Sequence, residues 1–429
     1  MKAISRISFL IVIGLFALGA CSEKSASDNE ENGEVNLEFW TINLKKDYGD
    51  YFENLISEYE EEHNDVKINW VDIPGDDVKQ KFISELSSDD VPDVVNLSSF
   101  LLLDLPDETL YPISELVDDS ELNQYFPNLL DSLTYDGEVL GVPWYNGGPP
   151  IGLLNEEVYK EAGLDPDNPP QNWDELLDNG KAIHENESDM FGSNDFPSLE
   201  ILMTNDIELL SDDGKEATFN TDEAVKFVDK FIKAYDEGSI AEGTAAETKG
   251  ANATNVATYQ QTLGNGLIGQ NGRDSTTHLP DYEENAPNQF PNFKVFPSVT
   301  NNDEYAIKYT MSFVIPKESD HPEEAADFAL YVTNAENQLE FSKEAPVFPS
   351  TEETLDDEYF TDIGDDTIEE KARSIQIDSL SDMVITNIDE ELRNAYRVEI
   401  AAAMMGEKTT EEALDDAAAR WNEELSKNE

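Results

Sequence analysis

The sequence is poor in cysteine, histidine and basic residues. Cys21 is the single cysteine among 429 residues, so no disulfide can form within the chain. The four histidines are far apart and lack the spacing of metal ligands, and no cofactor motif is present. Lysine and arginine number 27 against 94 aspartates and glutamates, which gives a net charge of -67. A chain this acidic is not expected to bind nucleic acid.

The composition is otherwise typical of a folded protein. Hydrophobic residues make up 39% of the chain and aromatic residues 10%, which predicts a packed core. The excess acid must therefore lie on the surface, where it repels itself at low ionic strength. Because the Debye length falls to about 3 Å in 1 M salt, we expect a halophilic host. Runs of Asp and Glu are interpreted as solvated faces.

The first twenty residues have the pattern of a secretion signal. Lys2 and Arg6 precede an apolar run over residues 7–18, which only Ser8 interrupts. A run of about a dozen residues is short for a transmembrane helix, which needs about 20. We predict a signal peptide over residues 1–20, with a retained membrane anchor as the alternative.

Cys21 follows Leu18, Gly19 and Ala20, and these four residues resemble the lipobox of bacterial lipoproteins. The resemblance implies that Cys21 is acylated, with palmitate-like chains, and becomes the mature N-terminus. Acyl chains contribute about 0.8 kcal/mol per buried CH2, so several would hold the protein at the outer face of the cell membrane. Residues 21–34, rich in Ser, Asn, Asp and Glu, then predict a solvated tether.

The remaining chain is long enough for two domains. Short apolar runs bounded by turn residues predict strands, among them VNLEFW, VKINWV, DVVNL, EVLGVP, IGLLN, GLIGQ, FKVFP and SFVIP. Amphipathic stretches over 52–59 and 413–425 predict helices, the second preceded by the capping-box pair Thr409 and Glu412. The alternation predicts open α/β sheets with ligands at the carboxyl ends of strands. GVPWYNGGPP, residues 141–150, is the predicted crossover out of the first domain.

The order of these motifs resembles the extracellular solute-binding proteins of bacterial ABC transporters, in the carbohydrate-binding branch that includes maltose-binding protein. The resemblance is carried by VNLEFW, SSDDVPDVVNLSS, DGEVLGVPW, LLNEEVYKEAGLDPDNPPQNWDELL and GEKTTEEALDDAAARWNEEL. It implies an α/β protein with the two-lobed type II periplasmic-binding fold, a hinge of crossing strands and a ligand cleft between the lobes. The implied lobes are residues 35–144 with 310–345, and residues 145–309 with 346–429.

The resemblance implies a binding protein and not an enzyme. A monomer of this kind captures a sugar or oligosaccharide outside the cytoplasm and delivers it to the permease subunits of an ABC importer, without a cofactor. The same fold also carries iron, phosphate or polyamines in related proteins, so a non-sugar solute is one alternative. A secreted glycoside-active enzyme is another, because so acidic a chain supplies carboxylate pairs by chance. A lipid-anchored scaffold without a ligand is the third.

Sugar sites combine flat aromatic rings with amides, hydroxyls and charged groups. The expected ligand-binding residues follow predicted strands, lie at the crossovers or precede the last helix: Trp40, Asn43, Asn96, Ser98, Trp144, Tyr145, Gln270, Asn271, Arg273, Tyr309, Ser312 and Arg393. Each tryptophan has a core residue as its alternative, and Trp173, with Asn172 as helix cap, is expected to be structural.

Two arginines depart from the pattern of maltose-binding protein. Where that protein has aromatic side chains, NGRDS and ELRNAY place Arg273 and Arg393. Guanidinium groups bind carboxylates through paired hydrogen bonds, so an acidic sugar such as a uronate oligomer is one expectation. Ion pairs of these arginines with acids of the chain itself are the other.

Overall fold

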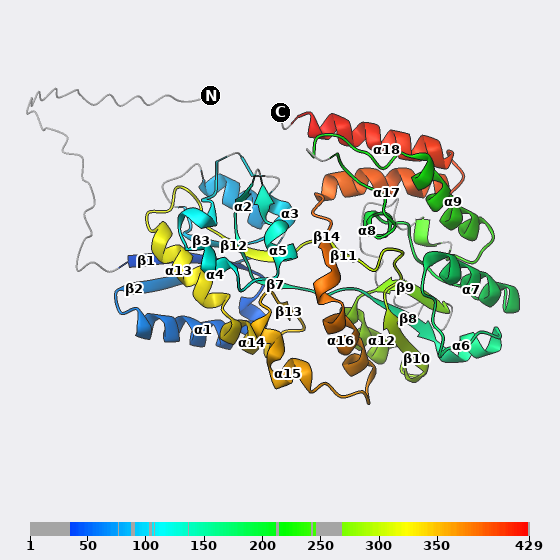
Figure 1. Ribbon diagram of the computed structural model, residues 1–429, viewed down its shortest axis with the longest axis horizontal. Helices are drawn as coiled ribbons and strands as arrows, with labels where there is room; N and C mark the ends of the chain where they lie inside the picture. Colours follow the sequence, from blue (N-terminus) through cyan, green and yellow to red (C-terminus); the bar gives the residue numbers. More distant parts are fainter. Residues whose placement is uncertain are drawn as a thin grey trace, which may run out of the picture.

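The computed structural model describes residues 35–75, 77–86, 91–102, 105–106, 108–135, 137–211, 214–241, 243–245 and 268–427. The predicted signal peptide, the lipidation site Cys21 and the tether lie outside these residues. The described chain forms two α/β lobes that lie side by side (Figure 1). No helix in these ranges is both long and apolar enough to span a membrane.

The first lobe is built on a five-stranded sheet with the order β2-β1-β3-β12-β6. Its strands are β1 (Val35–Ile42), β2 (Val66–Ile73), β3 (Val94–Ser98), β12 (Met311–Val314) and β6 (Val142–Pro143). β1 runs parallel to β2 and β3, whereas β12 is antiparallel to β3 and β6. The strands predicted from VNLEFW, VKINWV, DVVNL and SFVIP are therefore confirmed. All five residues of β3 are buried, as expected of a central strand covered on both faces.

Helices cover both faces of this sheet because successive side chains of a strand point in opposite directions. Phe39 packs edge-on against Phe328, with ring centroids 5.1 Å apart, in the core under α1 (Lys45–Glu62), α13 (Pro322–Val332) and α14 (Ala335–Glu344). The next residue, Trp40, packs against Phe82 on the other face, under α2 (Val78–Glu85) and α3 (Ser99–Leu102). The smaller elements of this lobe are η1 (Ile113–Glu115), α4 (Asp119–Leu122), α5 (Pro127–Asp131), β4 (Thr134–Tyr135) and β5 (Glu138–Val139).

The second lobe has a three-stranded antiparallel sheet. β8 (Ile151–Asn155) lies between β10 (Phe293–Pro297) and β9 (Gln270–Asp274). The runs IGLLN and FKVFP are strands as predicted, whereas in the region of GLIGQ the strand begins only at Gln270, and Ile268 forms a single bridge with Phe191. The helices are α6 (Glu156–Glu161), α7 (Trp173–Asn186), α8 (Leu199–Met203), α9 (Asp222–Asp236), η3 (Thr276–His278), α12 (Leu279–Asn285), η4 (Phe290–Asn292), α16 (Ile368–Asp378), α17 (Glu390–Met404) and α18 (Thr410–Leu425).

Two helix starts follow the caps that the sequence predicts. The hydroxyl of Thr409 accepts a hydrogen bond from the N–H of Glu412, whose carboxylate in turn accepts from the N–H of Thr409. Asn172 caps α7 by accepting from the N–H of Glu175 at 2.9 Å, and Trp173 is fully buried in the core. These caps satisfy backbone donors that a helix N-terminus otherwise leaves without partners.

The two lobes are joined by several passes of the chain. β7 (Tyr145–Asn146) pairs with β13 (Phe348–Pro349), and β11 (Tyr305–Ile307) pairs with β14 (Met383–Ile385). Figure 1 shows all four strands between the lobes. The remaining elements near them are η5 (Glu353–Asp356), α15 (Glu358–Thr361) and η6 (Leu380–Asp382). Two lobes and a hinge of crossing strands match the fold that the resemblance implies.

Candidate functional site

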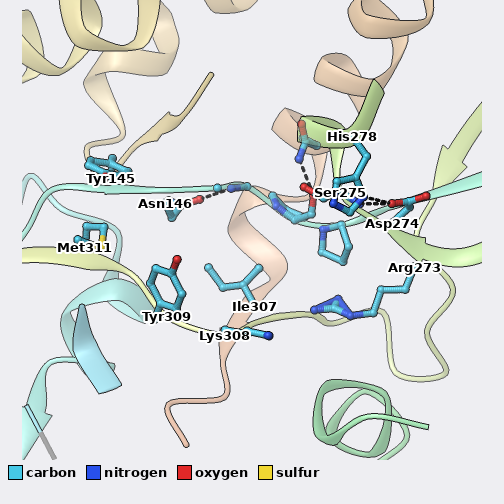
Figure 2. Close-up of a pocket in the computed structure, with 15 residues that line it drawn as sticks. Tyr145, Asn146, Arg273, Asp274, Ser275, His278, Ile307, Lys308, Tyr309 and Met311 are labelled. Carbon is cyan, nitrogen blue, oxygen red and sulfur yellow. Dashed lines mark hydrogen bonds and ion pairs between the residues drawn. The ribbon is translucent and has the colours of Figure 1, made fainter. Parts of the chain in front are cut away.

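A cavity of 520 Å³ opens where the crossing strands meet the sheet of the second lobe (Figure 2). This volume is within the range of about 300–1,000 Å³ that is typical of small-molecule sites. Its lining comes from β7 and the turn after it, β9 and η3, the segment from β11 to β12, and α16. The lining residues are Tyr145, Asn146, Gly147, Gly148, Pro149, Pro150, Arg273, Asp274, Ser275, His278, Ile307, Lys308, Tyr309, Met311 and Gln376.

Two tyrosines supply the aromatic part of the lining. Tyr309 follows β11, is 41% exposed and packs edge-on against Phe100, with ring centroids 5.4 Å apart. Tyr145 is half-buried and packs edge-on against Trp144, with ring centroids 4.6 Å apart. Burial raises the pKa of the Tyr145 phenol. An aromatic ring with one face available and a polar tip suits a ligand that has both apolar faces and hydroxyl edges.

Asp274, at the end of β9, organises the polar wall. Its carboxylate accepts hydrogen bonds from the Tyr282 hydroxyl at 2.9 Å and the Ser275 N–H at 2.7 Å, and it pairs with His278 Nδ1 at 2.7 Å. Burial lowers the pKa of His278, but the hydrogen bond and charge of Asp274 outweigh that effect and raise it overall. A carboxylate with this many partners is fixed in orientation and serves to position its neighbours.

Two cations face the cavity next to this wall. Arg273, on β9, is half-buried. Lys308 is exposed to the cavity and lies two residues before Thr310, which is buried. Desolvation by the surrounding protein lowers the pKa of both groups, and attraction by Glu200 acts in the opposite direction. Figure 2 shows the two side chains extending toward one another. Glu200, on α8, thus attracts both cations, but the ion pair that it forms among the described residues is with Arg393.

Arg393 holds the carboxylate of Glu200 in place. Its guanidinium forms a buried ion pair with Glu200, and its Nε donates to the carbonyl of Ile388 at 2.8 Å. Although burial opposes ionisation of Glu200, the charges of Arg393, Arg273 and Lys308 lower its pKa to about 2. Arg393 is 6% exposed and does not line the cavity. Its role in the structure is therefore to compensate Glu200.

A second buried carboxyl lies behind β9. Asp195 is 6% exposed, and its carboxylate accepts from the Gly272 N–H at 2.9 Å. Burial, with the nearby charge of Asp274, raises the pKa of Asp195 to about 7. Asp195 is therefore partly protonated near neutral pH, which reduces the negative charge beside Arg273.

The structure brings three of the twelve sequence-predicted site residues to the cavity. These are Tyr145, Arg273 and Tyr309. Trp40 and Trp144 are instead core residues: Trp40 packs on Phe82, and Trp144 stacks on Phe341 at 5.0 Å. Each indole is at most 1% exposed, so neither presents a face to a ligand.

The predicted polar residues outside the cavity are used for internal hydrogen bonds or lie elsewhere. In the sheet of the first lobe, the side-chain amide of Asn96 donates a hydrogen bond of 3.0 Å to the carbonyl of Ser312. The Ser312 hydroxyl donates a hydrogen bond of 3.0 Å to the carbonyl of Leu97. Gln270 donates to the carbonyl of Leu176 at 2.6 Å. Ser98 and Asn271 are buried, while Asn43 is exposed in a left-handed backbone conformation away from the cavity lining.

Several cavity residues were not predicted. Asn146 lies inside the crossover stretch that the sequence singled out, and Lys308 directly precedes Tyr309, so both had a positional signal. Asn146 is 2% exposed, and its Nδ2 has no hydrogen-bond partner within the described chain. Gln376 reaches the site from α16, where its Nε2 donates to Pro149 at 2.6 Å, and no local pattern marks it. Within the described ranges, no group of three His, Cys, Asp or Glu is placed to hold a metal ion.

Comparison with known proteins places this chain in a family. The model of the bacterial extracellular solute-binding protein family matches residues 44–339. A Brucella abortus (strain 2308) relative that is named as a binding protein is 24% identical over 160 residues, which are 37% of this chain and 38% of the relative. The match thus spans less than half of that relative's length.

Solved structures match over nearly the whole described chain. The structure of a periplasmic-binding protein from Synechococcus sp. MITs9220 has a TM-score of 0.78 at 22% identity, and the match covers 91% of this chain and 99% of that protein. The cyclic alpha-maltosyl-1,6-maltose binding protein of Arthrobacter globiformis has a TM-score of 0.72 at 21% identity, with coverage of 92% and 100%. At these identities the likeness shows the fold, and the family model covers more than half of the sequence. The chain belongs to the bacterial extracellular solute-binding protein family.

Proposed function

We propose that this protein is the substrate-binding component of a bacterial ABC importer, which captures a sugar or oligosaccharide and presents it to a membrane permease. The observation that carries the proposal is the cavity at the crossing strands, where Tyr145 and Tyr309 lie beside charged and amide side chains. Rings next to convergent polar groups suit a sugar. The Arthrobacter protein, which is named for binding cyclic alpha-maltosyl-1,6-maltose, supports a carbohydrate ligand for this fold.

The position of the cavity also supports capture by closure. Tyr145, Ile307 and Tyr309 belong to the chain segments that pass between the lobes, whereas Arg273 and Asp274 belong to the sheet of the second lobe. Hinge bending in such segments changes the distance between the lobes around a bound ligand. A ligand that contacts both lobes stabilises the closed state relative to the open one, and the permease then distinguishes the two states.

The remaining parts of the proposal concern location and assembly. An acylated Cys21 would tether a monomer to the outer face of the cell membrane, with residues 21–34 as the spacer and the lobes divided near residues 144 and 309. The family is extracellular, in agreement with this location. Mass spectrometry of protein extracted from membranes tests the lipid: a diacylated N-terminal Cys21 supports the tether, and an unmodified Met1 contradicts it.

The cavity opposes two of the alternatives, a polyamine ligand and a glycoside-active enzyme. A polyamine would meet Arg273 and Lys308, whose charges repel an organic cation. Glycoside hydrolysis requires two carboxyl groups on either side of the bond. Asp274 is the one carboxylate among the described lining residues, and its hydrogen bonds to Ser275, His278 and Tyr282 already occupy it.

A thermal-shift screen in molar KCl tests the proposal. The panel contains neutral mono- and oligosaccharides, acidic sugars, and spermidine. We expect at least one sugar to raise the unfolding temperature, because a ligand that binds only the folded state stabilises it by mass action. The sugar should be recovered intact after incubation with the protein. Stabilisation by spermidine alone, or conversion of a sugar to products, would overturn the proposal in favour of the corresponding alternative.

A further inference from the structure

The cavity concentrates positive charge in a chain that carries 94 acidic and 27 basic residues. Arg273 and Lys308 both line it, and both lie close enough to Glu200 to lower its pKa. Figure 2 shows their charged ends directed toward one another, Arg273 from β9 and Lys308 from the segment after β11. Two cations oriented in this way repel each other unless an anion lies between them.

The described part of the chain does not supply that anion. Among the described residues, no carboxylate oxygen lies within 4.0 Å of the charged nitrogens of Arg273 or Lys308. Glu200 already forms an ion pair with Arg393, and Asp274 pairs with His278. Glu390, which also acts on Lys308, pairs with Arg397 at 3.4 Å. Asp195, which acts on Arg273, accepts from the Gly272 N–H at 2.9 Å. These four described acids are therefore engaged with partners other than the side chains of the two cations.

Elsewhere on the protein, basic side chains readily find acidic partners. Lys67 pairs with Glu60 at 2.8 Å, and Lys294 pairs with Asp167 at 2.6 Å. Because acidic residues are in more than threefold excess, a basic side chain of this protein usually has a carboxylate within reach. Two cations without such a partner among the described residues line one cavity, where partial loss of water contacts already disfavours their charged forms. This indicates that the compensating charge comes from outside the described chain.

We propose that Arg273 and Lys308 form an anion subsite that binds the carboxylate or phosphate group of an acidic sugar. The inference rests on the proposed function and specifies its ligand class. The planar guanidinium of Arg273 would take two oxygens of the anion, and the ammonium of Lys308 would contribute a point charge from the crossing segment. Because the two residues come from β9 and from the segment after β11, the anion would also link the second lobe to the hinge. Arg393 and Glu200 act as positioning residues beneath the subsite.

Isothermal titration calorimetry in molar KCl tests the subsite with charge-matched probes. Digalacturonate is compared with its methyl ester, and glucose 1-phosphate with glucose. High salt screens the repulsion between an anion and the acidic surface, because its Debye length is about 3 Å, while a contact inside the cavity persists. We expect at least one acid to bind about tenfold or more tightly than its neutral counterpart. The acid that does so identifies the source of the anion.

Variants connect this preference to the two residues. Arg273→Gln and Lys308→Met should each weaken the preferred acid by about tenfold and leave its neutral counterpart within about twofold, since each change removes one charge-assisted contact. Lys317→Met, which removes an exposed lysine that does not line the cavity, is the matched control and should leave both affinities unchanged. Circular dichroism confirms that each variant is folded.

The outcomes separate the inference from the proposed function. Equal affinity for charged and neutral probes, or binding of neutral sugars alone in the wider panel, overturns the subsite and leaves sugar capture standing. An acid preference that persists in both Arg273→Gln and Lys308→Met also overturns the subsite. Binding of no sugar of either kind overturns both claims.

Discussion

At the scale of single residues, the buried ion pair of Glu200 and Arg393 lies near the two cations of the cavity. Both side chains are almost fully buried, at 4% and 7% exposure. Arg393→Met leaves the carboxylate without its partner, so we expect a loss of about 3–5 kcal/mol in the free energy of unfolding. Urea denaturation in molar KCl measures it. Adding Glu200→Leu to the same chain should recover much of the loss, and an unchanged stability for Arg393→Met alone would refute this role.

Asp195 gives a pH dependence with a defined sign. Its pKa is raised from 3.8 to about 7, mainly by burial, so between these pH values the folded state holds a proton that the unfolded state releases. The contribution of this group therefore makes the protein less stable as the pH rises from about 4 to 7. Asp195→Asn removes the titration, and its unfolding free energy should fall less over this range than that of the unchanged protein. Parallel slopes for the two proteins in urea titrations would contradict the assignment.

Tyr309 is the exposed ring on which a sugar would stack. Tyr309→Ala should weaken the panel sugar that gives the largest thermal shift by about tenfold, because aromatic contacts contribute about 0.5–1.5 kcal/mol beyond the area that they bury. Tyr309→Phe keeps the ring and should retain most of the affinity. The unfolding temperature without sugar should change little, since the side chain is 41% exposed. Equal affinities of the alanine variant and the unchanged protein would exclude stacking on this ring.

At the scale of elements, a close approach of two backbones positions the strand that carries Arg273. Gly192 accepts a hydrogen bond from the N–H of Gln270 at 3.0 Å and lies against Gly180 of α7. A Cβ at Gly192 would fall 2.1 Å from the Cα of Gly180. Neither backbone can yield without moving the helix or β9.

Gly192→Ala should therefore destabilise the protein by about 1–3 kcal/mol, the usual range for overpacking, and weaken ligand binding through a displaced β9. Gly49→Ala is the matched control, because a Cβ there meets no atom within 4 Å, and alanine in a helix is about 0.5–1 kcal/mol better than glycine. Urea denaturation of both variants measures the difference. Equal stability of the two would show that β9 tolerates the displacement.

Elements were easier to predict from the sequence than the site was. Apolar runs and caps locate strands and helix starts because these depend on neighbouring residues, as at Thr409 and Glu412. Trp40 shows why the site was harder to predict. The sequence places it near the end of a strand, but helices cover both faces of the sheet, so the ring would be buried whichever face it pointed to. The partner of Arg393 lies 193 residues away in Glu200, and no local pattern indicates it.

At the scale of the whole molecule, surface charge governs the response to salt. With a net charge of -67, repulsion between acidic groups opposes the compact state at low ionic strength. We expect the midpoint of thermal unfolding, followed by circular dichroism, to rise from millimolar to molar KCl as the Debye length shortens. Sucrose at matched osmolality controls for effects of the solvent other than screening. A midpoint that is constant or falls with KCl would contradict the expectation of a protein adapted to brine.

The central claim is that a sugar closes two lobes around the cavity at their crossing strands. Small-angle X-ray scattering of the purified protein in molar KCl, with and without the panel sugar of highest affinity, measures this most directly. The account predicts a smaller radius of gyration at saturating sugar, and little or no change for Tyr309→Ala at a sugar concentration that this variant binds poorly. An identical radius of gyration for the free and the sugar-saturated protein would contradict it.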